Sequence, residues 1–167
     1  MSEDSGEIAI PTQRGVVTFA SNQEWQDMRR GWRINICTAI ADLANTEMHR
    51  RIWLRPKKPW DHWSDIYEQF LTLLLVEPQD GLLHFQELGY LTAAEASVIS
   101  DLADVMSSYV PPENWTDEII LADPAWKNVC EIAAQTAERL HLLITEEDET
   151  RALTEGDPEW RRNDDED

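Results

Sequence analysis

WSDIYEQFLTLLL, residues 63–75, is the stretch that decides the fold expected for this chain. Its apolar side chains recur at helical spacing and cover nearly the whole circumference of one helix. They are Trp63, Ile66, Tyr67, Phe70, Leu71, Leu73, Leu74 and Leu75. A helix that is apolar on all sides belongs in the middle of a core. The pattern therefore predicts a mainly α, single-domain bundle of about five helices around this central apolar helix.

Amphipathic patterns on the N-terminal side supply two of the other helices. An apolar stripe at three- and four-residue steps runs through residues 22–43, directly after a capping residue, Ser21. A shorter helix follows over residues 48–53 and must end before Pro56, because proline cannot donate the backbone hydrogen bond of a helix interior.

The C-terminal side begins with a turn at residues 78–81, and residues 81–91 are expected to hold an extended piece or a small hairpin. Thr92 and Glu95 then form a capping box for the next helix. A last long helix starts at Asp123-Pro124, an N-cap followed by proline at the first helical position.

The ends of the chain differ from this middle. Residues 1–21 are expected to be an arm with room for a short β element at 15–21, which has no clear partner strand. Residues 22–145 are the predicted helical domain. Residues 146–167 contain eleven acidic residues and three arginines, so we expect an acidic flexible tail that buries too little apolar surface to offset its ordering entropy.

Charge is distributed unevenly along the chain, whose net charge is −19. Residues 1–60 hold nine Lys/Arg and seven Asp/Glu, a net of +2, whereas residues 61–167 hold five and 26, a net of −21. The acidic part should repel nucleic acid and anionic membranes and attract a basic protein partner. An acid excess that only keeps the protein soluble is the alternative.

The cysteines and the N-terminus favour a cytoplasmic protein. Cys37 and Cys130 stand far apart without metal-ligand spacing, so we expect two buried thiols in a reducing compartment. The first residues, MSEDSGE, lack the basic and apolar regions of a secretory signal. The longest strongly apolar run, residues 70–76, is too short to span a bilayer.

Motifs for catalysis are missing from the sequence: it contains no nucleophile elbow, phosphate-binding loop, dinucleotide fingerprint or zinc-protease motif. We therefore expect no enzyme and no cofactor. Glu138-x-x-His141 has the spacing of a helical metal-binding pair, and His62-x-x-Asp65 is the other such pair. A metal-dependent enzyme using Glu138 and His141 is one alternative hypothesis, and a solvated helix flank is the plainer interpretation.

A basic stretch, RRIWLRPKK at residues 50–58, lies beside Trp53, Trp60 and Trp63. Cations interleaved with aromatic residues are typical of single-stranded nucleic-acid binding, but the net charge of −19 opposes a polyanion. We therefore interpret the stretch as an internal strap, in which its arginines meet the protein's own acids and the tryptophans anchor the connector to the core. A protein-binding face and a nucleic-acid site remain the alternatives.

The candidate partner-binding residues are carboxylates around one loop tryptophan. A loop tryptophan among acids suits a binding hot spot, although the ring could equally fold back to cover the core. The predicted binding residues are Asp101, Asp104, Glu113, Trp115, Asp117, Glu118 and Asp123.

The order of these features resembles a family of small acidic bacterial proteins, frequent in actinomycetes, whose biochemical function is unassigned. The resemblance covers residues 35–143, and its most specific marks are Arg50-Arg51-x-Trp53 and Pro124-x-Trp126. The chain departs from the family in the connector at 56–60 and in its C-terminal tail. Some members lie near secreted toxin genes, as immunity proteins do, and the resemblance supplies no catalytic residues.

Charge, motifs and resemblance together predict a non-enzymatic protein-binding module. The expected function is that of an immunity-type inhibitor, which neutralises a basic toxin or effector through an acidic helical surface. A nucleic-acid mimic that inhibits a DNA-binding protein is the alternative, since charge alone does not separate the two.

Overall fold

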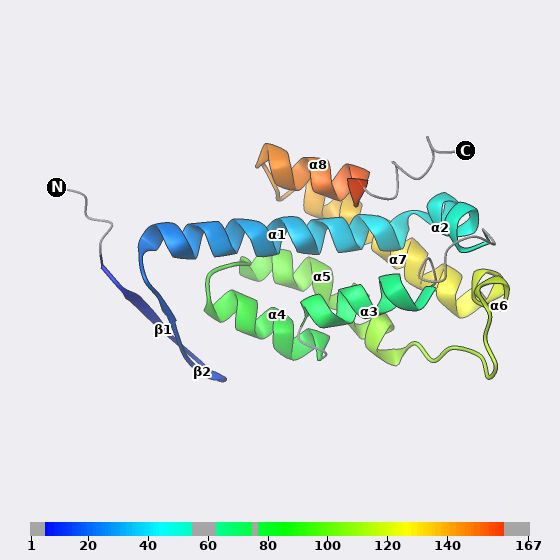
Figure 1. Cartoon of the computed structure of the whole chain (residues 1–167), viewed down its shortest axis with the longest axis horizontal. Coiled ribbons are helices and arrows are strands. Elements are labelled where there is room, and N and C mark those ends of the chain that lie inside the picture. The colour runs from blue at the N-terminus through cyan, green and yellow to red at the C-terminus, as the bar shows by residue number, and fades with distance from the viewer. Residues whose placement is uncertain (1–5, 55–62, 75–76, 159–167) are drawn as a thin grey trace.

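The computed structural model describes residues 6–54, 63–74 and 77–158. In these ranges the chain is mainly helical, with one two-stranded antiparallel hairpin (Figure 1). Its elements are β1 (Ile8–Thr12), β2 (Gly15–Phe19), α1 (Asn22–Ala44), α2 (Thr46–Trp53), α3 (Trp63–Leu73), α4 (Pro78–Glu87), α5 (Ala93–Ser108), α6 (Asp117–Ala122), α7 (Pro124–His141) and α8 (Glu147–Glu155). The mainly α fold class is confirmed, whereas the bundle has more helices than the five expected.

The helix at the centre is α1. It runs along the molecule with α7 and α8 packed on one side and α3 on the other (Figure 1). All residues from Ile36 to Leu43 except Thr38 are buried, because the small side chains of Cys37, Ala39 and Ala41 let neighbouring helices approach from several directions.

The prediction that residues 63–75 form the central helix therefore needs correction. In α3 only one face is fully buried, formed by Trp63, Ile66 and Phe70, while Tyr67 and Leu71 are half-buried. The apolar pattern around the whole circumference of this helix predicts burial on all sides. The structure instead gives that position to the longer helix, whose small residues permit close packing.

The helix N-caps predicted from the sequence are confirmed. Ser21 accepts a hydrogen bond from the Glu24 amide at the start of α1, and Asn45 re-caps the chain for α2. The capping box of Thr92 and Glu95 is complete at the start of α5. Asp123 caps α7, as expected. Both cysteines are buried free thiols, as predicted.

The β element has a partner that the sequence analysis did not find. β2 pairs with β1 in the register Ile8↔Phe19 to Thr12↔Gly15. Pro11 in β1 obscured the strand pattern, but a proline is tolerated in a two-stranded ribbon because each strand has a free edge.

Residues 78–87 form helix α4, not a turn followed by an extended piece. Pro78 stands in its first turn, where the missing amide hydrogen costs nothing. Gly81 is required because a Cβ at that position would collide with the backbone of Leu74, after α3. The glycine was interpreted as part of a turn, whereas it permits a close approach of two helices.

The segment expected as a flexible tail also differs in its first part. Residues Glu147–Glu155 form α8, which packs on α1 (Figure 1). Leu153 and Glu149 are both buried there, so one apolar contact and one ion pair order a segment of unfavourable composition. The proposed division into arm, domain and tail otherwise stays a prediction. Within the described ranges, no helix has the length and apolar character that crossing a membrane requires.

Candidate protein-binding site

Two of the predicted binding residues, Asp117 and Asp123, each accept a hydrogen bond from the backbone amide at the start of a helix. Asp117 is buried, and its Oδ1 accepts a hydrogen bond from the Trp63 amide at 3.1 Å, which caps the start of α3. Asp123 accepts from the Ala125 amide at 3.0 Å and from the Tyr109 hydroxyl at 2.8 Å. These carboxylates hold α3 and α7 in place.

Asp101 and Asp104 lie at a separate place, on α5 beside a groove of about 390 Å³ between α5 and α7. Asp101 is 3.5 Å from the Arg139 guanidinium, and Asp104 accepts a hydrogen bond from the Gln79 amide at 2.7 Å. Both carboxylates are exposed and have only weak or neutral partners.

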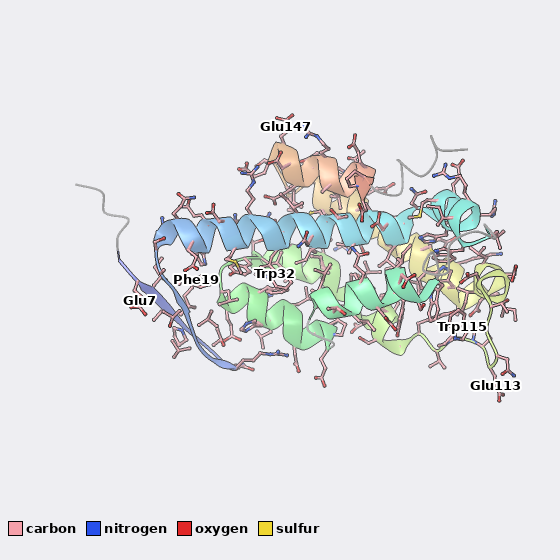
Figure 2. The ribbon with its side chains drawn as sticks, viewed as in Figure 1. Glu7, Phe19, Trp32, Glu113, Trp115 and Glu147 are labelled. Carbon is pink, nitrogen blue, oxygen red and sulfur yellow. The ribbon has the colours of Figure 1, made fainter. Side chains whose placement is uncertain are left out.

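The remaining three residues gather at the α6 end of the molecule. Figure 2 shows Glu113 and Trp115 in the loop before α6, and Glu118 is exposed on the helix itself. Trp115 is 37% exposed, and Ile119 on α6 is 41% exposed. We call these four residues, Glu113, Trp115, Glu118 and Ile119, the α6 face.

Trp115 stands on a rigid aromatic platform. Its ring meets Trp63 edge to face, with 4.9 Å between the centroids. Trp63 in turn contacts Tyr67 at 4.9 Å, Tyr109 at 5.8 Å and Trp126 at 5.9 Å. Contacts of this kind each add about 0.5–1.5 kcal/mol beyond their buried area. The partly exposed indole thus packs on the core in the absence of a partner.

A buried histidine next to this platform was missed by the sequence analysis. His49 stacks on Trp53 with 4.3 Å between the centroids, and its Nε2 lies 2.6 Å from the Asp42 carbonyl oxygen. Burial lowers the pKa of His49 to about 4, although the bond to Asp42 opposes the shift. His49 is therefore a neutral core residue at physiological pH.

A second missed feature is a buried ion cluster of Arg33, Glu95 and Glu149. Arg33 Nη2 bonds Glu95 Oε2 at 2.6 Å, Arg33 Nε bonds Glu149 Oε1 at 2.5 Å, and Nη1 donates to the Tyr90 carbonyl at 2.8 Å. Burial alone would lower the pKa of Arg33, but the two carboxylates outweigh it and raise the pKa. Burial would likewise raise the pKa of Glu95, yet hydrogen bonds from Arg33 and Thr92 hold it below its usual value.

The cluster joins three helices that are distant in sequence. Arg33 comes from α1, Glu95 from the first turn of α5, and Glu149 from the first turn of α8. No spacing rule relates these positions, so a single sequence offers no signal for them except the capping role of Glu95.

The second half of the basic strap, residues 55–58, and Trp60 lie outside the described residues, whereas Arg50 and Arg51 are described and exposed. Trp53 and Trp63 at its two ends are buried in the core. The strap as a whole stays a prediction.

Of the two candidate metal pairs, Glu138 with His141 lies wholly within the residues that the structure describes. In those ranges no three or more His, Cys, Asp or Glu side chains are placed to hold a metal ion. Glu138 and His141 are exposed, and His141 Nε2 lies 3.4 Å from the Thr154 hydroxyl. His62 lies outside the described residues.

Comparison of the chain with known proteins found no matching protein-family model, no matching curated protein and no matching solved structure. The resemblance to small acidic bacterial proteins therefore stays a prediction.

Proposed function

We propose that this chain is a non-enzymatic protein-binding module, an immunity-type inhibitor that neutralises a basic toxin or effector through its acidic surface. One observation carries the proposal: Trp115 is a partly exposed aromatic side chain packed on Trp63, and the exposed residues Glu113 and Glu118 stand on either side of it in the sequence. Binding hot spots commonly combine a rigid aromatic anchor with surrounding groups that exclude water or attract the partner.

The distribution of charge supports a basic partner. Residues 61–167 carry a net charge of −21, and the α6 face lies within this part of the chain. A field of that sign raises the rate at which a cationic protein associates, and salt screens it. Because the Trp115 ring is already packed on Trp63, little side-chain entropy is lost on binding.

The test is a co-purification of the full chain from its native cell lysate, at low salt and again near 0.5 M, where screening shortens to a few ångströms (about 4 Å). The expected result is a stoichiometric basic protein at low salt that is weakened at high salt. An empty bait under both conditions contradicts the proposal.

Paired charge-reversal variants locate the contact. The double variant Glu113→Lys/Glu118→Lys should lose the partner, because both side chains are exposed and the fold does not depend on them. Glu131→Lys/Glu138→Lys on α7 makes the same change in net charge and serves as the control. If both double variants lose the partner equally, the α6 face is not the contact surface. Competition by duplex DNA for the captured partner would favour the nucleic-acid-mimic alternative.

A further inference from the structure

The β-hairpin lies at one end of the molecule, and α6 lies at the other (Figure 1). In the part of the chain that the structure describes, β1 and β2 pair only with each other, so each strand has an outer edge. α4 packs against β1. An open strand edge is a template for pairing with another chain, and native proteins usually block it. The two edges of this hairpin differ in that respect.

The outer edge of β1 is interrupted by Pro11. Hydrogen-bonded and non-hydrogen-bonded residue pairs alternate along an antiparallel ladder. Pro11 has no amide hydrogen, so it belongs to a non-hydrogen-bonded pair, with Val16. The next such pair is Ala9 with Thr18. The backbone groups of these four residues therefore point to the outer edges, and on the β1 edge the proline breaks the row of donors.

The outer edge of β2 has no such interruption. The backbone amides and carbonyls of Val16 and Thr18 point outward and form no hydrogen bond within the described residues. Both residues are exposed, Val16 at 66%. Val17, between them, is half-buried against the core. β2 thus offers two complete sets of backbone donors and acceptors on three β-branched residues, the type that favours strand pairing.

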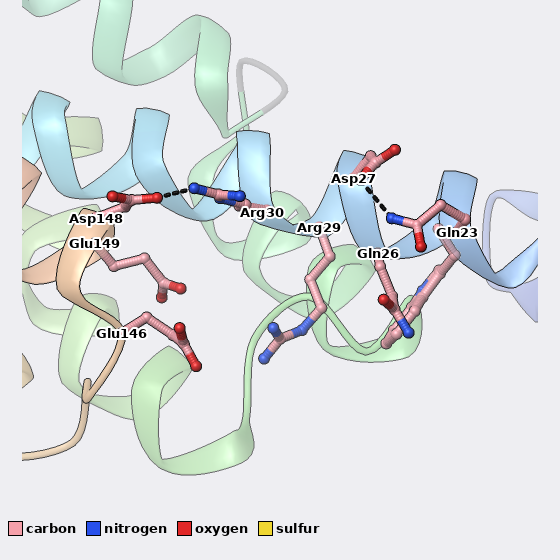
Figure 3. Close-up of a pocket in the computed structure, with 9 residues that line it drawn as sticks. Gln23, Gln26, Asp27, Arg29, Arg30, Glu146, Asp148 and Glu149 are labelled. Atoms are coloured by element: carbon pink, nitrogen blue, oxygen red, sulfur yellow. Dashed lines mark hydrogen bonds and ion pairs between the residues drawn. The ribbon is translucent and has the colours of Figure 1, made fainter.

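Charge makes this edge a place where two copies of the chain can meet. Residues 8–19 contain one charged side chain, Arg14, although the whole chain has a net charge of −19. The groove between the N-terminal half of α1 and the start of α8, by contrast, is lined by four carboxylates and two arginines (Figure 3). Two chains of the same large net charge repel each other, and the repulsion is smallest where local charge is low.

We propose that β2 pairs with β2 of a second copy, antiparallel about a two-fold axis, so that two hairpins form one four-stranded sheet. The outward backbone groups place Val16 opposite Thr18 of the second copy and Val17 opposite its own equivalent. Each Val16–Thr18 pair exchanges two hydrogen bonds. Because Pro11 interrupts the other edge, pairing stops at a closed dimer.

A second copy suits this edge better than a strand of the basic partner does. The strand residues of β2 carry no carboxylate that would attract a cationic protein, and self-pairing brings identical β-branched side chains together across the axis. The hairpin and α6 lie at opposite ends of the molecule, so the dimer leaves the α6 face of each copy open (Figure 1). The inference therefore does not rest on the proposed function.

Analytical ultracentrifugation of the full chain, at concentrations from about 1 µM to about 1 mM, measures the association. The expected result is a species of twice the chain mass, whose dissociation constant falls as salt rises from about 0.05 M to about 0.5 M, because salt screens the repulsion between two anions. Capture of a basic partner has the opposite salt dependence, so the two failures are distinguishable. A monomer under all these conditions overturns the proposal.

Two proline variants, opposite each other in the hairpin, test the edge. Thr18→Pro removes an outward amide from β2, and Ala9→Pro removes one from β1, while neither amide bonds inside the hairpin. Thr18→Pro should raise the dissociation constant at least about tenfold, because each dimer loses one hydrogen bond from each copy. Ala9→Pro should leave it unchanged. Equal effects of the two variants overturn the assignment to β2.

Cysteine variants test the register and keep the hairpin amides intact. In the dimer the Cα atoms of the two copies of residue 17 lie about 4.5 Å apart, which a disulfide can bridge. Those of residue 16 lie about 8 Å apart, which is too far. Mild oxidation should therefore cross-link Val17→Cys in preference to Val16→Cys, although Val16 is the more exposed residue. The native Cys37 and Cys130 are buried. Preferential cross-linking of Val16→Cys overturns the proposed pairing.

Discussion

Arg33 and Glu149 are 116 residues apart in sequence and meet in the protein interior, with Arg33 Nε bonded to Glu149 Oε1 at 2.5 Å. The side chains are 7% and 3% exposed, so neither charge has access to bulk water. This pair explains why a segment rich in acidic residues is folded onto α1. A buried ion pair of this kind adds little to the free energy of unfolding, but removing one of its partners destabilises the protein strongly.

Glu149→Gln should therefore destabilise the protein by about 2 kcal/mol, because a charge-assisted hydrogen bond is lost and Arg33 keeps only Glu95 as an anionic partner. Urea unfolding of the variant and the parent measures this difference. Glu147→Gln is the matched control, since its side chain is 86% exposed and its ion pair within the described residues is with Arg151, one turn on. The control should change stability by less than about 0.5 kcal/mol, and equal effects would contradict a structural role of the cluster.

His49 should make stability depend on pH. Burial lowers its pKa from 6.5 to about 4, so between these pH values the unfolded chain binds a proton that the folded chain does not. Stability due to this group is thus complete above pH 6.5 and falls as the pH decreases toward 4. At about 1.4 kcal/mol per pKa unit, the loss amounts to about 3 kcal/mol.

Unfolding free energies of the parent and of His49→Gln, measured across pH 4–7, isolate the histidine. The glutamine amide can still donate to the Asp42 carbonyl but cannot titrate. The difference in stability between the two proteins should therefore shrink as the pH falls. Two parallel pH curves would show that the imidazole is accessible to protons in the folded state.

Two glycines in helices should respond in opposite ways to alanine. Gly81→Ala places a Cβ against the backbone of Leu74 and should destabilise by about 1–3 kcal/mol. Gly31→Ala, in the exposed part of α1, meets no atom within 4 Å and should stabilise by about 0.5–1 kcal/mol. Thermal unfolding of both variants provides the measurement. A neutral Gly81→Ala would mean that α3 and α4 do not approach as closely as described.

Asp117 and Glu118 are adjacent in sequence but should affect different properties. Asp117→Ala removes the cap on the Trp63 amide and should cost about 1 kcal/mol or more of stability. Glu118→Ala, exposed on α6, should leave stability within about 0.5 kcal/mol and act only on partner binding. The free energies of unfolding of the two variants, measured by chemical denaturation, distinguish these roles. A loss of stability in Glu118→Ala would argue against its place in the α6 face.

The features that could be predicted from the sequence are local. Ser21, Thr92 with Glu95, and Asp123 with Pro124 each lie within a few residues of the amide that they cap, so short-range rules identify them. The apolar stripe of α7 is local in the same sense. Of the candidate site, the loop position of Trp115 left two alternatives, an exposed ring or a ring folded back onto the core, and the structure combines them: the ring is 37% exposed and packs on Trp63.

The features that the sequence did not reveal depend on contacts between distant segments. Nothing near Arg33 in the sequence indicates that it pairs with Glu149. From the sequence Asp117 is expected to be a surface residue, and only the structure shows that it accepts a hydrogen bond from the Trp63 amide. Gly81 indicates a turn by composition, and only the proximity of Leu74 shows why it stands inside a helix. Tertiary contacts override local propensity in each case.

The position of α8 has a consequence for the order in which the chain can fold during synthesis. α1 is made well before α7 and α8, the two helices that cover its buried face. A nascent chain that has not reached residue 149 holds Arg33 without one of its two carboxylates, and the face of α1 that α8 covers is open to water. Contacts of such sequence separation form slowly. The growing chain therefore displays an incomplete core to chaperones and proteases until α8 emerges.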